Sequence, residues 1–258
     1  MRVLFSGDVA WSTGRDVLAA SIPALKHDYG PFDFIVVNCE NAAHGKGMTQ
    51  KIFDQLISLG VDAMTSGNHI WDKSAFFPVL DADTRIFRPA NYSPMCPGRG
   101  YGIIERKAKR LGILNLQGQV FMPPIDNPFL CADECLEELH GVPVLVDFHA
   151  EATSEKLGLA NYLDGRVSAV IGTHTHVQTA DEKILPKGTA YITDAGMTGA
   201  HGGMLGVSYE SAMPKFLTGL PVKFEPCETE PAFNGVVIGI DETSNLASSI
   251  TRINLAAE

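Results

Sequence analysis

Two histidines separated by a single residue follow a short apolar segment in the second half of the chain. Residues 167–171 predict a buried strand, and residues 172–177 place His174 and His176 just past its end. Imidazole nitrogens are good ligands for divalent transition metals, so this spacing indicates a metal site. An isolated pair of histidines is weak evidence by itself, and the other strand ends of the chain decide the question.

Four further apolar segments end in the same manner, with metal-ligating residue types just beyond them. These segments cover residues 2–6, 34–37, 61–65 and 142–148, and each predicts a strand. The polar side chains that follow them are Asp8, then Glu40 and Asn41, then Asn68 and His69, and finally His149. Open α/β sheets bind ligands at the carboxyl ends of their strands. We therefore expect these side chains to form one site together with the histidine pair.

Each of these side chains also has an ordinary structural interpretation. Asp8 follows a glycine and suits a helix N-cap or a turn. Glu40 and Asn41 suit a polar turn, and His69 suits a histidine that is hydrogen-bonded within the fold. The glycine-rich residues 44–47 match no phosphate-binding loop motif. The combination of residue types at five strand ends nevertheless favours a functional site.

The metal-ligating set is larger than one ion requires. Three imidazoles, two carboxylates and two amides exceed the four ligands of a tetrahedral zinc site. They suit two metals about 3.5–4 Å apart that share a carboxylate. The five cysteines show no CxxC spacing, so we expect reduced thiols and no zinc knuckle. A nitrogen and oxygen donor set without thiolate favours iron or manganese, with zinc as a further possibility.

The composition excludes several classes of protein. The chain has 258 residues, is 45% hydrophobic and carries a formal net charge of −10. It lacks the basic surface that extended nucleic-acid binding requires, and no apolar run approaches the roughly 20 residues that span a bilayer. The N-terminal residues are too short and polar a stretch for a signal peptide. We therefore expect a cytoplasmic protein without a membrane segment.

The remaining patterns predict an α/β protein whose single domain spans residues 1–258. Residues 85–100 and 117–127 predict long loops, and residues 194–199 predict a glycine-rich return. The predicted helices cover residues 17–25, 52–59, 129–139, 153–163 and 208–217. The predicted paired strands cover residues 101–106 with 111–116, 181–185 with 189–193, and 232–240 with 249–254.

The order of the motifs resembles that of the calcineurin-like metallophosphoesterases. The matching elements are Gly-Asp at residues 7–8, Gly-Asn-His at 67–69, the lone His149 and Gly-Thr-His-Thr-His at 172–176. The resemblance implies a four-layer α/β/β/α sandwich of two mixed sheets, the metallophosphoesterase fold. It also implies a dinuclear metal centre that hydrolyses phosphate esters.

The sequence departs from the general pattern of that family at two places. Ala10 stands where the family has a histidine, and residues 38–41 replace a second aspartate motif. These departures are similar to the bacterial YmdB-type branch, as are residues 88–92 and 196–199. That branch contains cyclic nucleotide phosphodiesterases, with 2′,3′-cyclic AMP among their substrates. The resemblance thus implies a small-molecule phosphodiester substrate, and Asn41 is the natural replacement for the missing histidine.

The resemblance also implies roles for the individual residues. Metal 1 would take Asp8, Glu40, Asn41 and His176. Metal 2 would take Glu40, Asn68, His149 and His174, so Glu40 would bridge the two ions. A hydroxide held between the metals would attack phosphorus, because two cations keep its pKa near neutral. His69, which is not a ligand, would protonate the leaving alkoxide.

Three other interpretations remain open at this point. An amidohydrolase also uses paired histidines, but they usually lie on the first strand of a TIM barrel rather than late in the chain. A metal-binding regulator without catalytic activity would have no need of His69. A phosphomonoesterase or nucleotidase of the same fold would keep the same ligands. The sequence leaves the oligomeric state open, and a homo-oligomer is possible.

Overall fold

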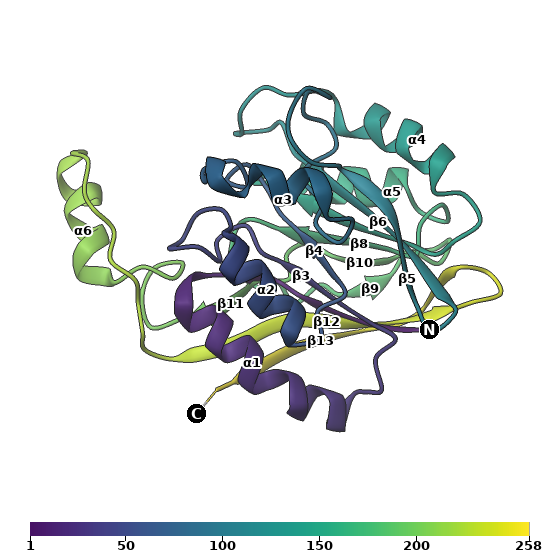
Figure 1. Cartoon of the computed structure of the whole chain (residues 1–258), viewed down its shortest axis with the longest axis horizontal. Helices are drawn as coiled ribbons and strands as arrows, with labels where there is room; N and C mark the ends of the chain where they lie inside the picture. Colours follow the sequence, from purple (N-terminus) through teal and green to yellow (C-terminus); the bar gives the residue numbers. More distant parts are fainter. Residues whose placement is uncertain (258) are drawn as a thin grey trace.

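The computed structural model of the protein describes residues 1–257, and within them the chain forms two mixed β-sheets (Figure 1). The first sheet consists, in spatial order, of β2 (Asp8–Val9), β11 (Met197–Ala200), β12 (Pro231–Asp241), β1 (Arg2–Ser6), β3 (Phe34–Asn38) and β4 (Ala63–Thr65), with β13 (Leu246–Ala256) paired to β12. The second sheet consists of β5 (Tyr101–Arg106), β6 (Lys109–Gln117), β7 (Val144–His149), β8 (Ala169–Thr173), β10 (Ala190–Ile192) and β9 (Lys183–Ile184).

Parallel strands lie at the centre of both sheets and determine where the polar strand ends meet. In the first sheet β1, β3 and β4 are parallel neighbours. In the second sheet the parallel strands are β6, β7, β8 and β10. Strand β12, from the C-terminal part of the chain, is antiparallel to β1 and lies between β1 and β11. The carboxyl ends of the parallel strands therefore share one edge of each sheet, as ligand sites in α/β proteins require.

Helices cover the outer face of each sheet (Figure 1). The helices are α1 (Trp11–Asp28), α2 (Gln50–Ser58), α3 (Phe77–Ala82), α4 (Pro128–Glu138), α5 (Thr153–Tyr162) and α6 (Tyr209–Thr218). Helices α1 and α2 pack on the first sheet, and α4 and α5 pack on the second. The predicted four-layer α/β/β/α sandwich is confirmed. This architecture excludes the TIM barrel of an amidohydrolase.

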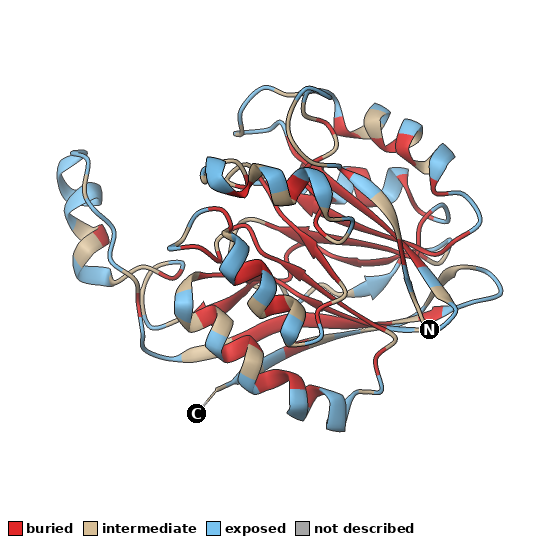
Figure 2. Cartoon of the chain, in the orientation of Figure 1, coloured by how far each residue is buried: buried red, intermediate tan, exposed pale blue. Residues whose placement is uncertain are grey.

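Side chains of the central strands alternate between two buried interfaces. In β1, Val3 and Phe5 face the second sheet, where they join a cluster that includes Leu145 and Ile171, whereas Leu4 faces α1 and α2. Burial of each such side chain contributes about 1.5–3 kcal/mol. Strands covered on both faces are apolar almost without interruption, which is why they could be predicted from the sequence. In Figure 2 the buried residues accordingly concentrate in the strands and on the inner faces of the helices.

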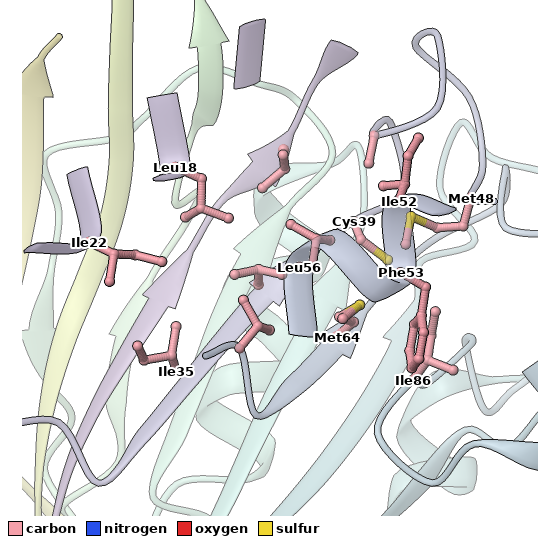
Figure 3. Close-up of a cluster of buried hydrophobic side chains, with 14 of the residues drawn as sticks. Leu18, Ile22, Ile35, Cys39, Met48, Ile52, Phe53, Leu56, Met64 and Ile86 are labelled. Carbon is pink, nitrogen blue, oxygen red and sulfur yellow. The ribbon is translucent and has the colours of Figure 1, made fainter. Parts of the chain in front are cut away.

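Helices α1 and α2 bury their apolar side chains against the first sheet. Figure 3 shows Leu18 and Ile22 of α1 and Leu56 of α2 pointing toward the sheet that contains Ile35. Thr49 caps α2 by accepting a hydrogen bond from the backbone N–H of Ile52. The packed helix α2 fixes the loop before it, which continues directly from the polar end of β3.

Several short elements differ from the predictions. Residues 197–200, predicted as part of an irregular return, form strand β11, and Asp8 with Val9 forms β2 beside it. The turn between β5 and β6 contains only Lys107 and Ala108, both with positive φ, so β6 begins two residues earlier than predicted. Helix α3 had no predicted counterpart. Among the described residues, no helix has both the length and the apolar character that a membrane crossing demands.

Candidate active site

The structure brings the eight predicted site residues to the edge where the two sheets meet. The first sheet supplies Asp8 from β2, Glu40 and Asn41 after β3, and Asn68 and His69 after β4. The second sheet supplies His149 as the last residue of β7, and His174 and His176 from the loop after β8. Neither sheet alone contains the complete set, so the site exists only when the sheets are packed together.

Donor atoms from the two sheets lie in direct contact. His149 Nε2 is 3.1 Å from Glu40 Oε2 and 3.1 Å from His174 Nδ1. The backbone N–H of His174 donates to Asp8 Oδ2 at 3.2 Å. Two ligands of a tetrahedral ion with bonds of about 2.1 Å lie roughly 3.4 Å apart, so these spacings are close to those of neighbouring ligands. As they stand, no three His, Cys, Asp or Glu side chains within residues 1–257 enclose a common point closely enough to hold an ion.

A second group of contacts surrounds His176 and Asn41. His176 Nε2 is 3.1 Å from Asn41 Oδ1 and 3.9 Å from Asp8 Oδ1. The amide nitrogen of Asn41 donates to the carbonyl oxygen of Gly45, which is the turn role that the sequence allowed. The same side chain therefore braces a turn and presents its carbonyl oxygen to His176. Asp8 does not cap helix α1, whose N-cap residue is Ala10.

Hydrogen bonds behind the histidines fix which ring nitrogen carries the proton. Thr173 donates its hydroxyl proton to Asp147 Oδ1 at 2.7 Å, so it accepts from His149 Nδ1 at 3.0 Å. The second nitrogen of His149, Nε2, then has a free lone pair. Such outer partners commonly set the tautomer of metal-binding histidines.

The other two histidines also have oxygen atoms beside their ring nitrogens. His176 Nδ1 lies 3.3 Å from the carbonyl oxygen of Leu205 and Nε2 lies 3.1 Å from Asn41 Oδ1, so both of its ring nitrogens face an oxygen acceptor. His174 Nε2 lies 3.2 Å from the Glu151 carboxylate, which leaves Nδ1 free toward His149. Two lone pairs that face each other at 3.1 Å repel, and a cation beside both nitrogens removes that repulsion. The rings of His149 and His174 thus present unprotonated nitrogens to the interior of the site.

Buried oxygens of three predicted ligands have no hydrogen-bond partner. These atoms are Asp8 Oδ1, Glu40 Oε2 and Asn68 Oδ1. The contact of Glu40 Oε2 with His149 does not satisfy it, because the facing nitrogen carries no proton. An unpaired buried polar atom costs about 1–3 kcal/mol, and more when it is charged. Oxygen atoms left in this state are suited to a positively charged ion.

The protonation behaviour of the site also suits a cation. Burial raises the pKa of Asp8 and of Glu40 to about 7, because it removes water from around their charged forms. Burial lowers the pKa of His149 to about 4 and, with the neighbouring imidazoles, that of His174 to about 3. Metals bind neutral imidazole and ionised carboxylate, and a bound cation stabilises both forms. The donor set therefore fits the metal ions that the sequence predicted.

His69 lies at the border between the buried donors and the solvent. Its backbone N–H donates to Glu40 Oε1 at 3.3 Å, and its ring Nδ1 lies 3.0 Å from Asp72 Oδ2. Gly67 lets the Glu40 carboxylate and the His149 ring approach the backbone just before His69, since a Cβ there would overlap both. The side chain of His69 lines the cavity above the site. Asp72 thus orients a ring that is accessible to a substrate.

Lys156 and Asp194 hold the histidine loop in place, and no pattern in the sequence singled them out. Lys156 Nζ donates to Asp194 Oδ2 at 2.7 Å, and both side chains are at most 1% exposed. The same carboxylate oxygen accepts from the backbone N–H and the hydroxyl of Thr175. His174 and His176, on either side of Thr175, have φ values of +96° and +64°. Residues other than glycine rarely adopt such values, so the buried pair stabilises a strained loop.

Asp147 is a second residue that the sequence analysis did not identify. It lies within β7, is fully buried and accepts hydrogen bonds from Thr65, Thr173 and Asn38. Burial raises its pKa to about 7. An acidic residue inside an otherwise apolar strand was the available signal, because such a residue must be paired or functional. Asp147 connects β3 and β4 to β7 and so links the two halves of the site.

A cavity of about 830 Å³ opens directly above these residues. Its floor contains Glu40, Asn41, His69, His174 and His176. Its volume lies within the range of small-molecule binding sites. The site is therefore accessible to a ligand considerably larger than a phosphate group.

Comparison with known proteins shows the family of this chain. The family model of YmdB-like proteins matches residues 4–253. The chain belongs to the YmdB-like family. It is 52% identical over 255 residues to the 2′,3′-cyclic-nucleotide 2′-phosphodiesterase of Bacillus subtilis, a match that covers 98% of this chain and 96% of the relative. The predicted family resemblance is confirmed, and with it the prediction of a phosphoester hydrolase.

Two solved structures extend the comparison of this YmdB-like chain. A novel phosphatase from Mycoplasma pneumoniae is 33% identical, with a TM-score of 0.93 over 99% of this chain and 93% of that one. A putative 5′-nucleotidase from Staphylococcus aureus is 15% identical, with a TM-score of 0.61 over 100% of this chain and 55% of that one. At 15% identity, the similarity to the putative 5′-nucleotidase shows only that the two proteins share a fold. The family implies divalent metal ions, in agreement with the donor set described above.

Proposed function

We propose that this protein is a metal-dependent phosphodiesterase that hydrolyses 2′,3′-cyclic nucleotides such as 2′,3′-cyclic AMP. The observation that carries the proposal is the arrangement of donors at the sheet edge. Unprotonated nitrogens of His149 and His174, together with the ring of His176, lie beside the unpaired oxygens of Asp8 and Glu40 beneath an open cavity. The named activity of the Bacillus subtilis relative supplies the substrate class.

The proposed centre holds two metal ions, with iron or manganese favoured and zinc as an alternative. Asp8, Asn41 and His176 would hold one ion, and Asn68, His149 and His174 the other, with Glu40 shared between them. Bound ions would neutralise the phosphoryl oxygens and lower the pKa of a bound water. The protein's own contribution is to fix the tautomers of His149 and His174 through Thr173 and Glu151, and to orient the ring of His176 beside Leu205.

His69 is the proposed general acid of the reaction. It lines the cavity, is not engaged with the buried donors through its ring, and is oriented by Asp72. From this position the protonated ring would donate its proton to the ribose oxygen that leaves phosphorus. Ribose alkoxide is a poor leaving group, so this proton transfer lowers the barrier substantially.

The location and organisation of the chain are also matters of proposal. All five cysteines are free thiols, which supports a reducing, cytoplasmic environment. Because the site takes side chains from both sheets, we propose that residues 1–258 act as a single domain. Size-exclusion chromatography with light scattering would establish whether the protein forms a homo-oligomer.

The experiment that tests the proposed function is an activity profile of protein whose metal content has been measured. The substrates are 2′,3′-cyclic AMP, the linear diester bis-(p-nitrophenyl) phosphate and the monoester p-nitrophenyl phosphate. We expect hydrolysis of both diesters and much slower hydrolysis of the monoester. A preference for the monoester would indicate a phosphomonoesterase instead. Metal-loaded protein inactive on all three substrates would favour a regulator without catalytic activity.

A further inference from the structure

The cavity above the site has an outer part that the metal centre does not explain. Beyond the donor residues, its lining includes Trp11, His44, Lys46, Phe216 and Phe224. A cyclic phosphate bound at the donors would fill only the floor of this cavity of about 830 Å³. The remainder of the substrate must extend into the outer part, because the phosphate is held at the donors and the cavity opens in that direction.

Trp11 forms a fixed aromatic wall on one side of this outer part. Its backbone N–H donates to the carbonyl oxygen of Asn41, and its φ of +62° is unusual for a residue other than glycine. Its ring packs against Gly45 and Gly206, where a Cβ on either residue would contact the indole. Trp11 is thus held in position before any ligand binds, which reduces the entropy lost on binding.

The other side of the outer part is formed by the α6 segment, residues 208–225. Figure 1 shows α6 standing apart from both sheets. The segment closes on itself, since the backbone N–H of Ser208 donates to the carbonyl oxygen of Glu225 at 2.8 Å. Phe216 is 73% exposed and Phe224 is 39% exposed, although both line the cavity. Lys215 Nζ lies 5.4 Å from the centre of the Phe224 ring.

We propose that the outer part of the cavity binds the nucleobase of the substrate by stacking on Trp11 and on the aromatic side chains of the α6 segment. The proposal rests on the proposed function, because that function places the phosphodiester at the floor. A nucleobase is flat and apolar on its faces and polar at its edge. It therefore matches aromatic walls that carry Lys46 and Lys215 beside them.

Stacking of this kind has a consequence for selectivity. Every base presents a π-face, so aromatic stacking discriminates little between bases of the same size. Purines have the larger face and bury more area. We therefore expect 2′,3′-cyclic AMP and 2′,3′-cyclic GMP to be hydrolysed with similar kcat/KM, and both to be better substrates than the pyrimidine analogues.

The test compares 2′,3′-cyclic AMP with methyl riboside 2′,3′-cyclic phosphate, which keeps the reacting ring and lacks the base. In the wild type, kcat/KM should be about 5-fold to 150-fold higher for the nucleotide, the range that one stacked base provides. Phe216→Ala should lower this ratio about five-fold, mainly through KM. Leu217→Ala is the matched control, because Leu217 is adjacent on α6, is 77% exposed and does not line the cavity. It should leave the ratio unchanged.

Two outcomes of this comparison would overturn the base site. One is a wild-type ratio near one, and the other is an equal loss in the Phe216→Ala and Leu217→Ala variants. If the wild type hydrolyses neither diester, it is the proposed function that fails. Binding measurements then test the base site without reference to catalysis.

Binding is measured with Trp71→Phe protein, in which Trp11 is the remaining tryptophan. Adenosine 3′-monophosphate should quench the fluorescence of Trp11 saturably, whereas ribose 3-phosphate at the same concentration should not. Calorimetric titration of the wild type with the same two ligands provides a second measurement if the variant does not fold. Equal binding of the two ligands in the titration, or no quenching by the nucleotide, would contradict a base site at Trp11.

Discussion

The side chains that support the floor of the cavity and those at its outer end are held in opposite ways. We call the buried residues Asp147, Lys156 and Asp194 the inner wall, and the α6 segment the outer wall. Behind the floor, Asp147, Lys156 and Asp194 are at most 1% exposed and connect elements far apart in the sequence through hydrogen bonds. At the outer end, Phe216 is 73% exposed, and the α6 segment is hydrogen-bonded mainly within itself. The inner wall therefore determines geometry, and the outer wall contributes contact surface.

This difference corresponds to what each wall must do. Ligand atoms must be held within a fraction of an ångström for metal binding and catalysis, which requires supporting side chains that are themselves fixed. A stacked base needs only a flat apolar surface at the correct distance. Substitutions in the inner wall should therefore alter metal content, chemistry and folding, whereas those in the outer wall should alter substrate affinity alone.

The largest effect is expected at Glu40, the proposed shared ligand at the floor. Glu40→Gln keeps the size of the side chain but removes the negative charge, so occupancy of both metals and hydrolysis of diesters should fall together. Elemental analysis and kinetics measure the two effects. Glu137→Gln, an exposed control, should change neither. Two tightly held ions in the Glu40 variant would exclude a bridging role.

A smaller but selective effect is expected at His69, which lies between the two walls. His69→Ala should slow hydrolysis of 2′,3′-cyclic AMP about 10²–10⁴-fold, the usual contribution of a general acid. Bis-(p-nitrophenyl) phosphate has a good leaving group and should be affected far less, with metal content unchanged. Equal losses on both substrates would indicate that His69 binds phosphoryl oxygens. Loss of metal would make it a ligand or a structural support.

Lys156 tests whether the inner wall stabilises the fold as well as the site. Lys156→Met leaves the Asp194 carboxylate buried without its cation, which should lower the free energy of unfolding by about 3–5 kcal/mol. Denaturant unfolding measures this change. Lys51→Met, at an exposed position of α2, should stay within about 0.5 kcal/mol of the wild type.

A double variant separates the two roles of this buried pair. Lys156→Met combined with Asp194→Asn leaves no charge buried, so most of the stability should return. The Thr175 contacts would be weakened, so metal affinity should remain reduced. Full recovery of both properties would mean that the pair does not position the histidine loop.

The smallest effect is expected from the outer wall. Phe216→Ala and Leu217→Ala remove side chains that are already largely exposed, so each should change the free energy of unfolding by less than about 0.5 kcal/mol. A loss above 2 kcal/mol in either variant would show that the α6 segment is packed more firmly than its exposure indicates. The contrast between the walls would then no longer hold.

The sequence predicted the central strands and the candidate ligands for two different physical reasons. Strands such as β3 and β8 are buried on both faces, so their sequences are largely apolar and predict a buried strand directly. Asp8, Glu40 and His149 were recognisable because metal-ligating residue types follow several such strands in turn. Both signals are local in the sequence, so one chain was sufficient to find them.

What the sequence did not reveal depends on contacts between distant segments. Strands β2 and β11 are short and pair only with tertiary neighbours, so their residues carry no periodic pattern. Lys156 lies on a helix where a lysine normally faces solvent, and its partner Asp194 is 38 positions away. Trp11 and Phe216 become part of one cavity only in the folded chain. Spatial proximity of this kind cannot be read from residue spacing.

The place of β12 between β1 and β11 has a consequence for synthesis on the ribosome. Val3 of the first strand pairs with Ile238, near the C-terminal end of the chain. At a synthesis rate of about 5–20 residues per second, β12 is made roughly 12–50 s after β1, and one edge of β1 is unpaired during that interval. The strand that precedes Asp8 therefore gains this neighbour only after β12 has been synthesised. A nascent chain that stops before β12 should lack a complete centre, and the newly made enzyme should become active only once β12 has paired with β1.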